Sequence, residues 1–503
     1  MVNLRQANVT LRLSRAWSEA DSVVTEHSRL LAGGGDPTGE ATPAGLRHRG
    51  ELPPRSSLAL RLAGWTDTSW KRFLLLQLLP VLVVVFWFSV PIPVDLWPDR
   101  GDADDPSIGR PAKMNFWFFL LFYYGGYNAV ALWLVNQIFR VYALNWWPSS
   151  MTAWSANVMT WLSTLVVGAI IYYCALQNLE KFTLTWVLLT LTTLLLPVLV
   201  SLGVLRSQNR NRHRHTLTEF QKIFLAEAEW RTPSSYRRFL WFAVTLSITY
   251  LALLAGEYLA HLFLSTLPHT WLDGLIYVYS WVITVFVFGY VAEWIIEAKI
   301  HSWPLTMIYR YYFTLIYFIF YRSLFARLRS LDQFVLVQLG SSLWVVCIYP
   351  IRMSRWVHSL LVYLFGLERP YEDYVKHISR TFFLRNYAEN TTMVAFLASV
   401  VILHFGPNAR FYPYFSFRPP VDDHPEHQYT LALTLWASLA VWASELAASF
   451  CTRWIVWLCY GHAIGREAAK DFQRYPELAL AMIFVAIHVL QDMLLALIQL
   501  DFT

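Results

Sequence analysis

The chain has 503 residues, of which 56% are hydrophobic and only 15% are charged, and its formal net charge is +6. Soluble domains carry roughly 25% charged residues, so the composition excludes an ordinary water-facing surface over most of the chain. A mean hydropathy of +0.38 favours a protein whose main partner is the lipid bilayer. No nucleic-acid-binding module accompanies the positive charge, which suits contact between basic cytosolic loops and anionic lipid head groups.

Residues 1–70 differ from the rest of the chain, because their charges are scattered and they contain no long apolar run. The stretch Gly33-Gly34-Gly35-Asp36-Pro37 adds turn-forming residues, and together these features predict a disordered cytosolic tail. Within the tail, Glu26, Leu30 and Leu31 match the acidic dileucine pattern that clathrin adaptors read. A short amphipathic helix over 11–31 is the alternative interpretation. The tail is also where protein partners would bind.

From residue 71 onward, apolar blocks of about 20 residues follow one another, as membrane-spanning helices require. The blocks do not alternate polar with apolar residues, which excludes a transmembrane barrel. We therefore predict an all-α, polytopic membrane bundle of about eleven helices, with nine to twelve tolerable. The predicted spans are 73–94, 114–138, 151–176, 182–205, 239–264, 275–296, 305–321, 334–350, 393–405, 429–450 and 478–500. Eight thus lie in 71–350 and three in 390–503, separated by an amphipathic cytosolic segment over 351–389.

Positive charge sets the predicted orientation. The loop 206–238 is strongly basic, and basic loops stay in the cytosol, so alternation of the spans also places the amino terminus there. One loop disagrees, because Arg322, Arg327 and Arg329 fall on the opposite side. Either the span over 305–321 is re-entrant, or these arginines pair with acidic groups. The tail, the basic loop and the many spans favour a eukaryotic endomembrane or plasma-membrane protein.

Ionisable residues within the spans are the main pointers to function, since burying a charge in a bilayer costs roughly 2.5–3.5 kcal/mol on insertion scales. His488 and Asp492 share one face of the last span, and at 1.5 Å per residue they lie about 15 and 21 Å past its start. Glu257 and His261 share a face in the same way, and Glu445 stands alone in its span. Glu293 lies near the cytosolic boundary and is a weaker candidate.

A carboxylate beside an imidazole can carry a proton, and it can also hold a divalent cation such as zinc, manganese or iron. Glu257, His261, Glu445, His488 and Asp492 would form one ion pathway if their three helices meet. The alternative is that each histidine caps its own carboxylate, or that each pair bonds to neighbouring helices and fixes their packing. We therefore expect a transporter or channel-like protein, coupled to protons or divalent cations.

Two other functions stay open. A membrane enzyme acting on a lipid or lipid-linked substrate could use His404 and Asn408, although no zinc, nucleotide or nucleophile-elbow motif identifies a cofactor or a reaction. An assembly or trafficking factor would instead act through its tail and its cytosolic loops. The sequon at Asn390 falls on the predicted cytosolic side, so we expect it to carry no glycan.

Overall fold

The computed structural model describes residues 61–62, 64–93, 113–142, 154–174, 179–207, 235–265, 271–300, 302–325, 331–366, 370–415, 417 and 430–502. Every described residue belongs to the unit Leu52–Thr503. The predicted sorting motif of Glu26, Leu30 and Leu31 therefore lies outside the described residues, as do residues 1–60 of the predicted tail and the basic loop over 208–234.

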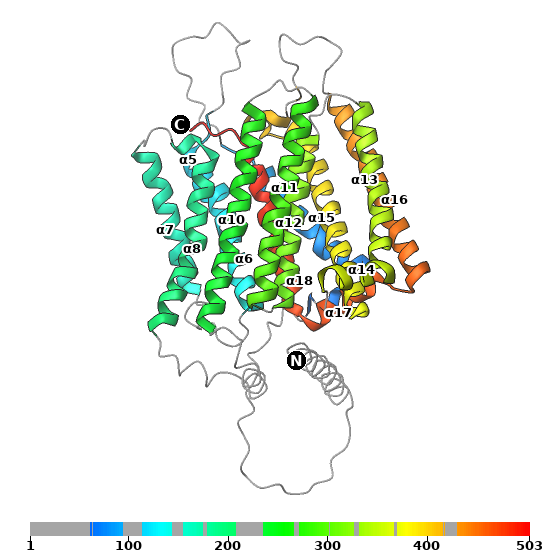
Figure 1. Ribbon diagram of the computed structural model, residues 1–503. Helices are drawn as coiled ribbons and strands as arrows, with labels where there is room; N and C mark the ends of the chain where they lie inside the picture. Colours follow the sequence, from blue (N-terminus) through cyan, green and yellow to red (C-terminus); the bar gives the residue numbers. More distant parts are fainter. Residues whose placement is uncertain are drawn as a thin grey trace, which may run out of the picture. The chain divides into compact units, whose positions relative to one another are not determined.

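The described part of the chain is helical and contains no strand, which confirms the all-α class (Figure 1). Its first half comprises α3 Ser69–Phe73, η1 Leu74–Leu78, α4 Leu79–Ser89, α5 Phe116–Phe118, η2 Phe119–Tyr124, α6 Gly125–Tyr142, α7 Trp154–Tyr173, η4 Leu179–Lys181, α8 Thr183–Ser207, α10 Ser235–Ser265, α11 Trp271–Ile295 and η6 Ile296–Ile300. Its second half comprises α12 Trp303–Phe325, α13 Leu331–Met353, α14 Arg355–Phe365, α15 Tyr371–Phe405, η7 Ala409–Phe411, η8 Pro413–Phe415, α16 Leu431–Tyr460, α17 Ile464–Arg474 and α18 Pro476–Leu497.

Among the described residues, seven helical stretches are long and apolar enough to cross a membrane. Shorter apolar helices occupy Asn157–Tyr173 and Thr183–Leu199. The count of about eleven spans stays a prediction. The seven stretches are Ser69–Ser89, Phe116–Phe139, Phe239–Gly256, Tyr279–Ile300, Tyr371–Phe405, Leu431–Tyr460 and Pro476–Leu497.

The helix α18 lies at the centre of this bundle. In its most apolar stretch 94% of the residues are buried, against 28% in Tyr279–Ile300 and 22% in Leu431–Tyr460. It packs against α6, α12 and α4, and Figure 1 shows it in red behind α11 and α12. A helix that is apolar on all sides is expected in such a position, surrounded by other helices.

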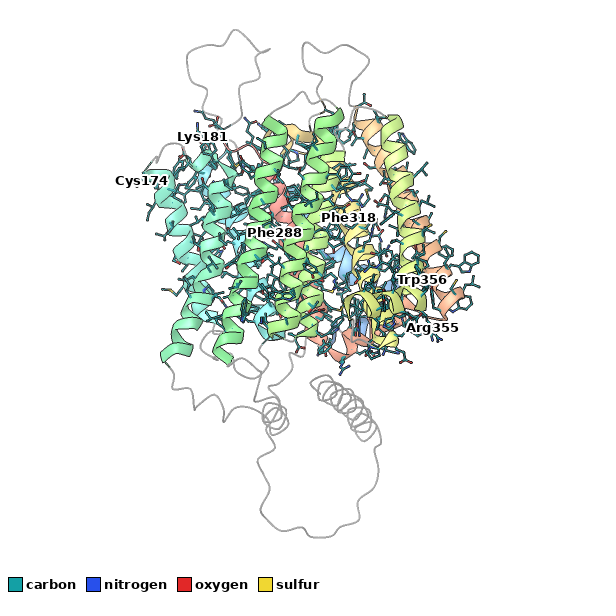
Figure 2. All side chains as sticks on the ribbon, in the orientation of Figure 1. Cys174, Lys181, Phe288, Phe318, Arg355 and Trp356 are labelled. Atoms are coloured by element: carbon teal, nitrogen blue, oxygen red, sulfur yellow. The ribbon has the colours of Figure 1, made fainter. Side chains whose placement is uncertain are left out.

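The outer helices expose large apolar side chains, such as Trp356 of α14, which is labelled at the edge of the bundle in Figure 2. Phe286 and Tyr290 on α11 are 71% and 74% exposed, and Trp436 on α16 is 73% exposed. Water-soluble monomers rarely expose continuous apolar surface of this extent. Lipid tails, in contrast, cover such side chains at no cost, so the surface is compatible with a bilayer around the bundle.

The helix α15 differs most from the prediction. It runs without a break from Tyr371 to Phe405, whereas the sequence placed a span over 393–405 and an interfacial segment over 351–389. Only α14 matches that segment, as a short helix capped by Ser354 at its start and by left-handed Gly366 at its end. The first half of α15 is charged, which lowers its hydropathy, but many of those side chains have partners on neighbouring helices.

At Gly256 the backbone of α10 lies close to aromatic rings of α11 and α12. A β-carbon added at Gly256 would lie 2.7 Å from the Trp281 ring and 2.8 Å from the Phe320 ring. These distances are too short for a real contact, so any larger residue would push α10 away from its neighbours. Small residues at helix contacts serve this purpose in membrane bundles.

Candidate functional site: ionisable side chains within the bundle

Two of the predicted site residues, His488 and Asp492, lie one turn apart on α18 and are only 3% and 2% exposed. One residue of α6 contacts both of them. The Tyr127 hydroxyl donates a hydrogen bond of 2.6 Å to Asp492 Oδ1, and the Tyr127 ring stacks on the His488 ring with centroids 5.0 Å apart. Within the described part of the chain, the Asp492 carboxylate belongs to no ion pair.

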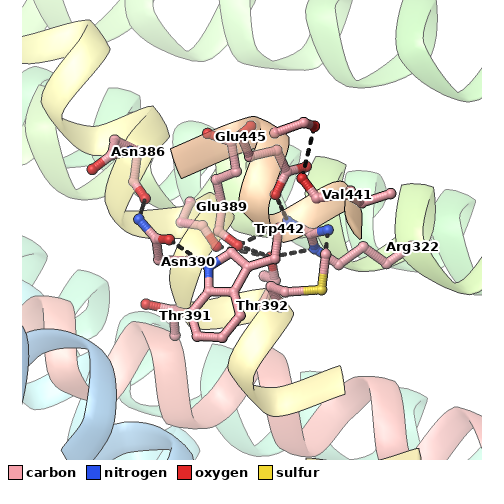
Figure 3. A network of polar contacts seen from close by, with 12 residues as sticks. Arg322, Asn386, Glu389, Asn390, Thr391, Thr392, Val441, Trp442 and Glu445 are labelled. Carbon is pink, nitrogen blue, oxygen red and sulfur yellow. Dashed lines mark hydrogen bonds and ion pairs between the residues drawn. The ribbon is translucent and has the colours of Figure 1, made fainter. Parts of the chain in front are cut away.

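Glu445 is in a different situation, because a cation compensates its charge. Its Oε2 lies 2.9 Å from Nη2 of Arg322, which reaches across from the last turn of α12. The same guanidinium donates to the Thr392 hydroxyl at 3.1 Å and to the Glu389 backbone carbonyl at 2.9 Å (Figure 3). Arg322 therefore has the pairing role that the sequence left open. Arg327 and Arg329 lie outside the described residues.

The sequence did not reveal the neighbours of this ion pair on α15. Asn386 donates to the Ser449 hydroxyl at 2.7 Å, and Asn390 accepts a hydrogen bond of 2.9 Å from the Trp442 ring nitrogen. One helical turn separates Arg385 from Glu389, and their charged groups lie 3.6 Å apart. The contacts of Asn386 and Asn390 join α15 to α16, as Figure 3 shows for Asn390 and Trp442. These residues lie near the end of the predicted cytosolic segment, and nothing in the sequence there indicates that they contact another helix.

Glu257 and His261 lie in α10, but their side chains fall outside the described residues. The described partners of Asp492 and Glu445 lie on different helices, α6 for the first and α12 for the second. Among the described residues, no three His, Cys, Asp or Glu side chains gather where they could hold a metal ion.

Two further ion pairs lie outside the predicted set. Glu293, the weaker candidate, accepts two hydrogen bonds from Arg310 of α12, and Arg310 also donates to the Thr381 hydroxyl at 2.7 Å. Arg380 of α15 makes two hydrogen bonds of 2.6 Å to Asp471 of α17. Paired donors of this kind are the strongest form of the Arg–carboxylate contact. The first pair joins the consecutive helices α11 and α12, whereas the second joins α15 to α17 across 91 residues of sequence.

The residues of the enzyme hypothesis have structural contacts. Asn408 accepts a hydrogen bond from the Ile92 backbone, and its amide group donates to the carbonyl groups of Phe88 and Val90. It thereby holds the end of α4, where the helix has left these backbone groups without partners. A nitrogen of the His404 ring lies 2.9 Å from the Phe415 carbonyl oxygen.

Comparison with known proteins gives a family but no activity. The model of the family described as SPCC553.12c matches residues 58–498. The chain belongs to this family. It is also similar to a protein of Schizosaccharomyces pombe named "Uncharacterized protein C553.12c", with 37% identity over 441 residues that cover 86% of this chain and 81% of the relative. No solved structure matches the chain.

Proposed function

We propose that this chain is an integral membrane transport protein that conducts protons along a polar pathway between α6 and α18. The observation that carries the proposal is Asp492, which is buried in the central helix and receives a hydrogen bond from a neutral hydroxyl, Tyr127. Ionisable groups inside a membrane bundle typically mark pathways for ions, protons or substrates.

The chemistry of a buried carboxyl group supports protons as the transported species. An ionised carboxylate that is removed from water without a cation costs far more free energy than the neutral acid. A proton that binds Asp492 removes this cost, and the Tyr127 hydroxyl stabilises the anion after the proton leaves. Asp492 can therefore alternate between the two states, whereas Glu445 is paired with the Arg322 cation.

The other predicted residues take different places in the proposal. His488 lies beside Asp492 and shares its contact with Tyr127, so it belongs to the same pathway. Glu445 fixes the packing of α12, α15 and α16 through its ion pair. Glu257 and His261 remain proposed contributors from α10, which packs against α12. We place the protein in an endomembrane or the plasma membrane, with its amino-terminal tail in the cytosol and its basic loops on anionic lipids.

Proton flux into liposomes tests the proposal directly. The full chain is reconstituted with the pH-sensitive dye pyranine inside, and a potassium gradient with valinomycin supplies the driving voltage. We expect uptake well above that of empty liposomes. Asp492→Asn should abolish it, because an amide keeps the hydrogen bond from Tyr127 but binds no proton.

A matched control distinguishes loss of the pathway from general damage. Asp373 lies in the first turn of α15 with 61% of its side chain exposed, so Asp373→Asn should conduct like the wild type. Both variants should also elute as monodisperse protein and keep the wild-type melting temperature. Wild-type flux no higher than the lipid background, or unchanged flux in Asp492→Asn, would contradict the proposal.

A further inference from the structure

A cavity lies beside His488. It is lined by residues of α6, α10, α12 and α18, and it offers about 30 Å³ to the centres of water molecules. Roughly 10–15 Å³ on this measure holds one water, so the cavity has room for one or two. Its walls are mainly apolar and include no Asp, Glu, Lys or Arg, with Val135, Leu246 and Val485 among them.

Two polar atoms of the lining residues have no hydrogen-bond partner within the described part of the chain. One is Nδ1 of His488 and the other is the hydroxyl of Tyr309, and both are buried. Leaving a buried polar group unsatisfied costs about 1–3 kcal/mol, so two such groups beside one cavity call for a shared partner. Of the other polar side chains there, Tyr312 donates to the Thr249 carbonyl and Thr249 donates to the Leu246 carbonyl.

We propose that this cavity is a hydration site, in which one or two water molecules bridge His488 Nδ1 and the Tyr309 hydroxyl. A water has two hydrogens and two lone pairs, so it can serve a hydroxyl and an imidazole nitrogen together. A buried water commonly makes about three such bonds, and Tyr250, which also lines the cavity, offers a further hydroxyl.

This inference rests on the proposed function and assigns a step within it. An excess proton that reaches the water as hydronium passes to Nδ1, which leaves neutral water and an imidazolium ring. That ring lies one helical turn from the Asp492 carboxylate, and Tyr127 contacts both. The titratable groups that face His488 are thus Asp492 on its own helix, Tyr127 on α6, and the cavity tyrosines of α10 and α12.

X-ray footprinting tests the hydration site without any transport assay. Radiolysis turns bound water into hydroxyl radicals, which oxidise the side chains next to it even when these are buried. Tyr309 is 2% exposed and should be oxidised, whereas Tyr123, which is fully buried and donates to the Phe88 carbonyl, should not. Oxidation of Tyr309 no greater than that of Tyr123 would overturn the proposal.

A cavity-filling variant tests the role of the water. Val485→Leu adds a methylene group to the lining, and the matched Val489→Leu adds one to the same helix at a residue that does not line the cavity. We expect Val485→Leu to lose the Tyr309 oxidation and to lower proton flux by at least about tenfold, equivalent to about 1.4 kcal/mol in barrier height. Val489→Leu should retain both.

The two proposals fail in different ways. Suppose that the wild type conducts protons, that Asp492→Asn does not, and that Val485→Leu has lost the oxidation of Tyr309. If the proton flux of Val485→Leu is then unchanged, the water is not part of the pathway, and the proposed function still holds. If the wild type conducts no protons, the proposed function fails, and with it the step assigned to this water. The oxidation of Tyr309 then still decides whether the cavity is hydrated.

Discussion

The guanidinium of Arg322 and the carboxylate of Glu445 lie 2.9 Å apart, with only 5% and 7% of their side chains exposed. This pair joins the end of α12 to the middle of α16, and a hydrogen bond to the Glu389 carbonyl includes α15 as well. Three helices are thus tied together at one guanidinium. Its main consequence concerns stability.

Removing one partner of this pair should destabilise the bundle strongly. Arg322→Met leaves the Glu445 carboxylate buried without a cation, and breaking a buried pair in this way costs about 3–5 kcal/mol. The double variant Arg322→Met with Glu445→Met should recover most of that loss, because no charge remains. Thermal unfolding in detergent measures both. The exposed pair Lys376–Asp373 is the control, and Lys376→Ala should change stability by less than about 1 kcal/mol. An Arg322→Met variant as stable as the wild type would refute this assignment.

Asn408 should act as a structural residue at the end of α4. Asn408→Ala removes the partner of the Ile92 amide and of the Val90 carbonyl, at about 1–3 kcal/mol for each that stays dry, whereas the Phe88 carbonyl keeps its hydrogen bond from Tyr123. We expect a lower melting temperature and faster hydrogen exchange at Ile92. Ser163→Ala removes an exposed hydroxyl that bonds within its own helix, and it should change neither. Normal stability with a lost enzymatic activity would instead favour the catalytic reading of Asn408.

The sequon at Asn390 should carry no glycan. Its side chain donates to the Asn386 carbonyl and accepts from Trp442, and only 7% of the residue is exposed. A glycan there would have to replace both contacts inside the bundle. Treating protein from eukaryotic cells with peptide N-glycosidase F should leave its mobility on a gel unchanged. A mobility shift that Asn390→Gln abolishes would place this part of α15 outside the bundle during synthesis.

Arg380 should anchor α17 through geometry as well as charge. It bonds Asp471 with two donors and lies 4.5 Å from the centroid of the Trp303 ring. Lysine keeps the charge but provides neither the two-donor fork nor a flat group for stacking. We expect Arg380→Lys to cost about 1–3 kcal/mol, as loss of a charged hydrogen bond does. Lys470→Gln, which breaks a pair exposed on the lysine side, should cost less, and an equal loss in both variants would argue against this role.

The central helix α18 was predictable because nearly all of its residues are apolar, and hydropathy is read from each residue without knowledge of its contacts. The span predicted over 478–500 corresponds to α18, Pro476–Leu497, and the one over 239–264 to α10, Ser235–Ser265. The candidates His488 and Asp492 followed from the same apolar run. An ionisable residue within an apolar stretch can be recognised from the sequence without knowing which side chain it contacts.

The full length of α15 could not be found in this way, because a hydropathy average treats each charged residue as unpaired. Arg380 and Arg385 count against a buried helix, yet Asp471 and Glu389 neutralise them. Glu389 lies one turn from Arg385 on the same helix, but Asp471 lies 91 residues from Arg380, and only the packing of the helices brings those two together. The same holds for Arg322 and Glu445, which were noticed separately and not as a pair.

The position of α18 has a consequence for biosynthesis. The most buried helix of the described bundle is translated after α4, α6 and α12, against which it packs, and Phe502 of an aromatic cluster follows it. Until it emerges from the ribosome, α4, α6 and α12 lack the surface against which they pack. Nascent chains must therefore persist in an incomplete state, in which Tyr127 faces lipid or a membrane chaperone in place of Asp492. Chains that stop early should be recognised by this exposed hydroxyl and degraded.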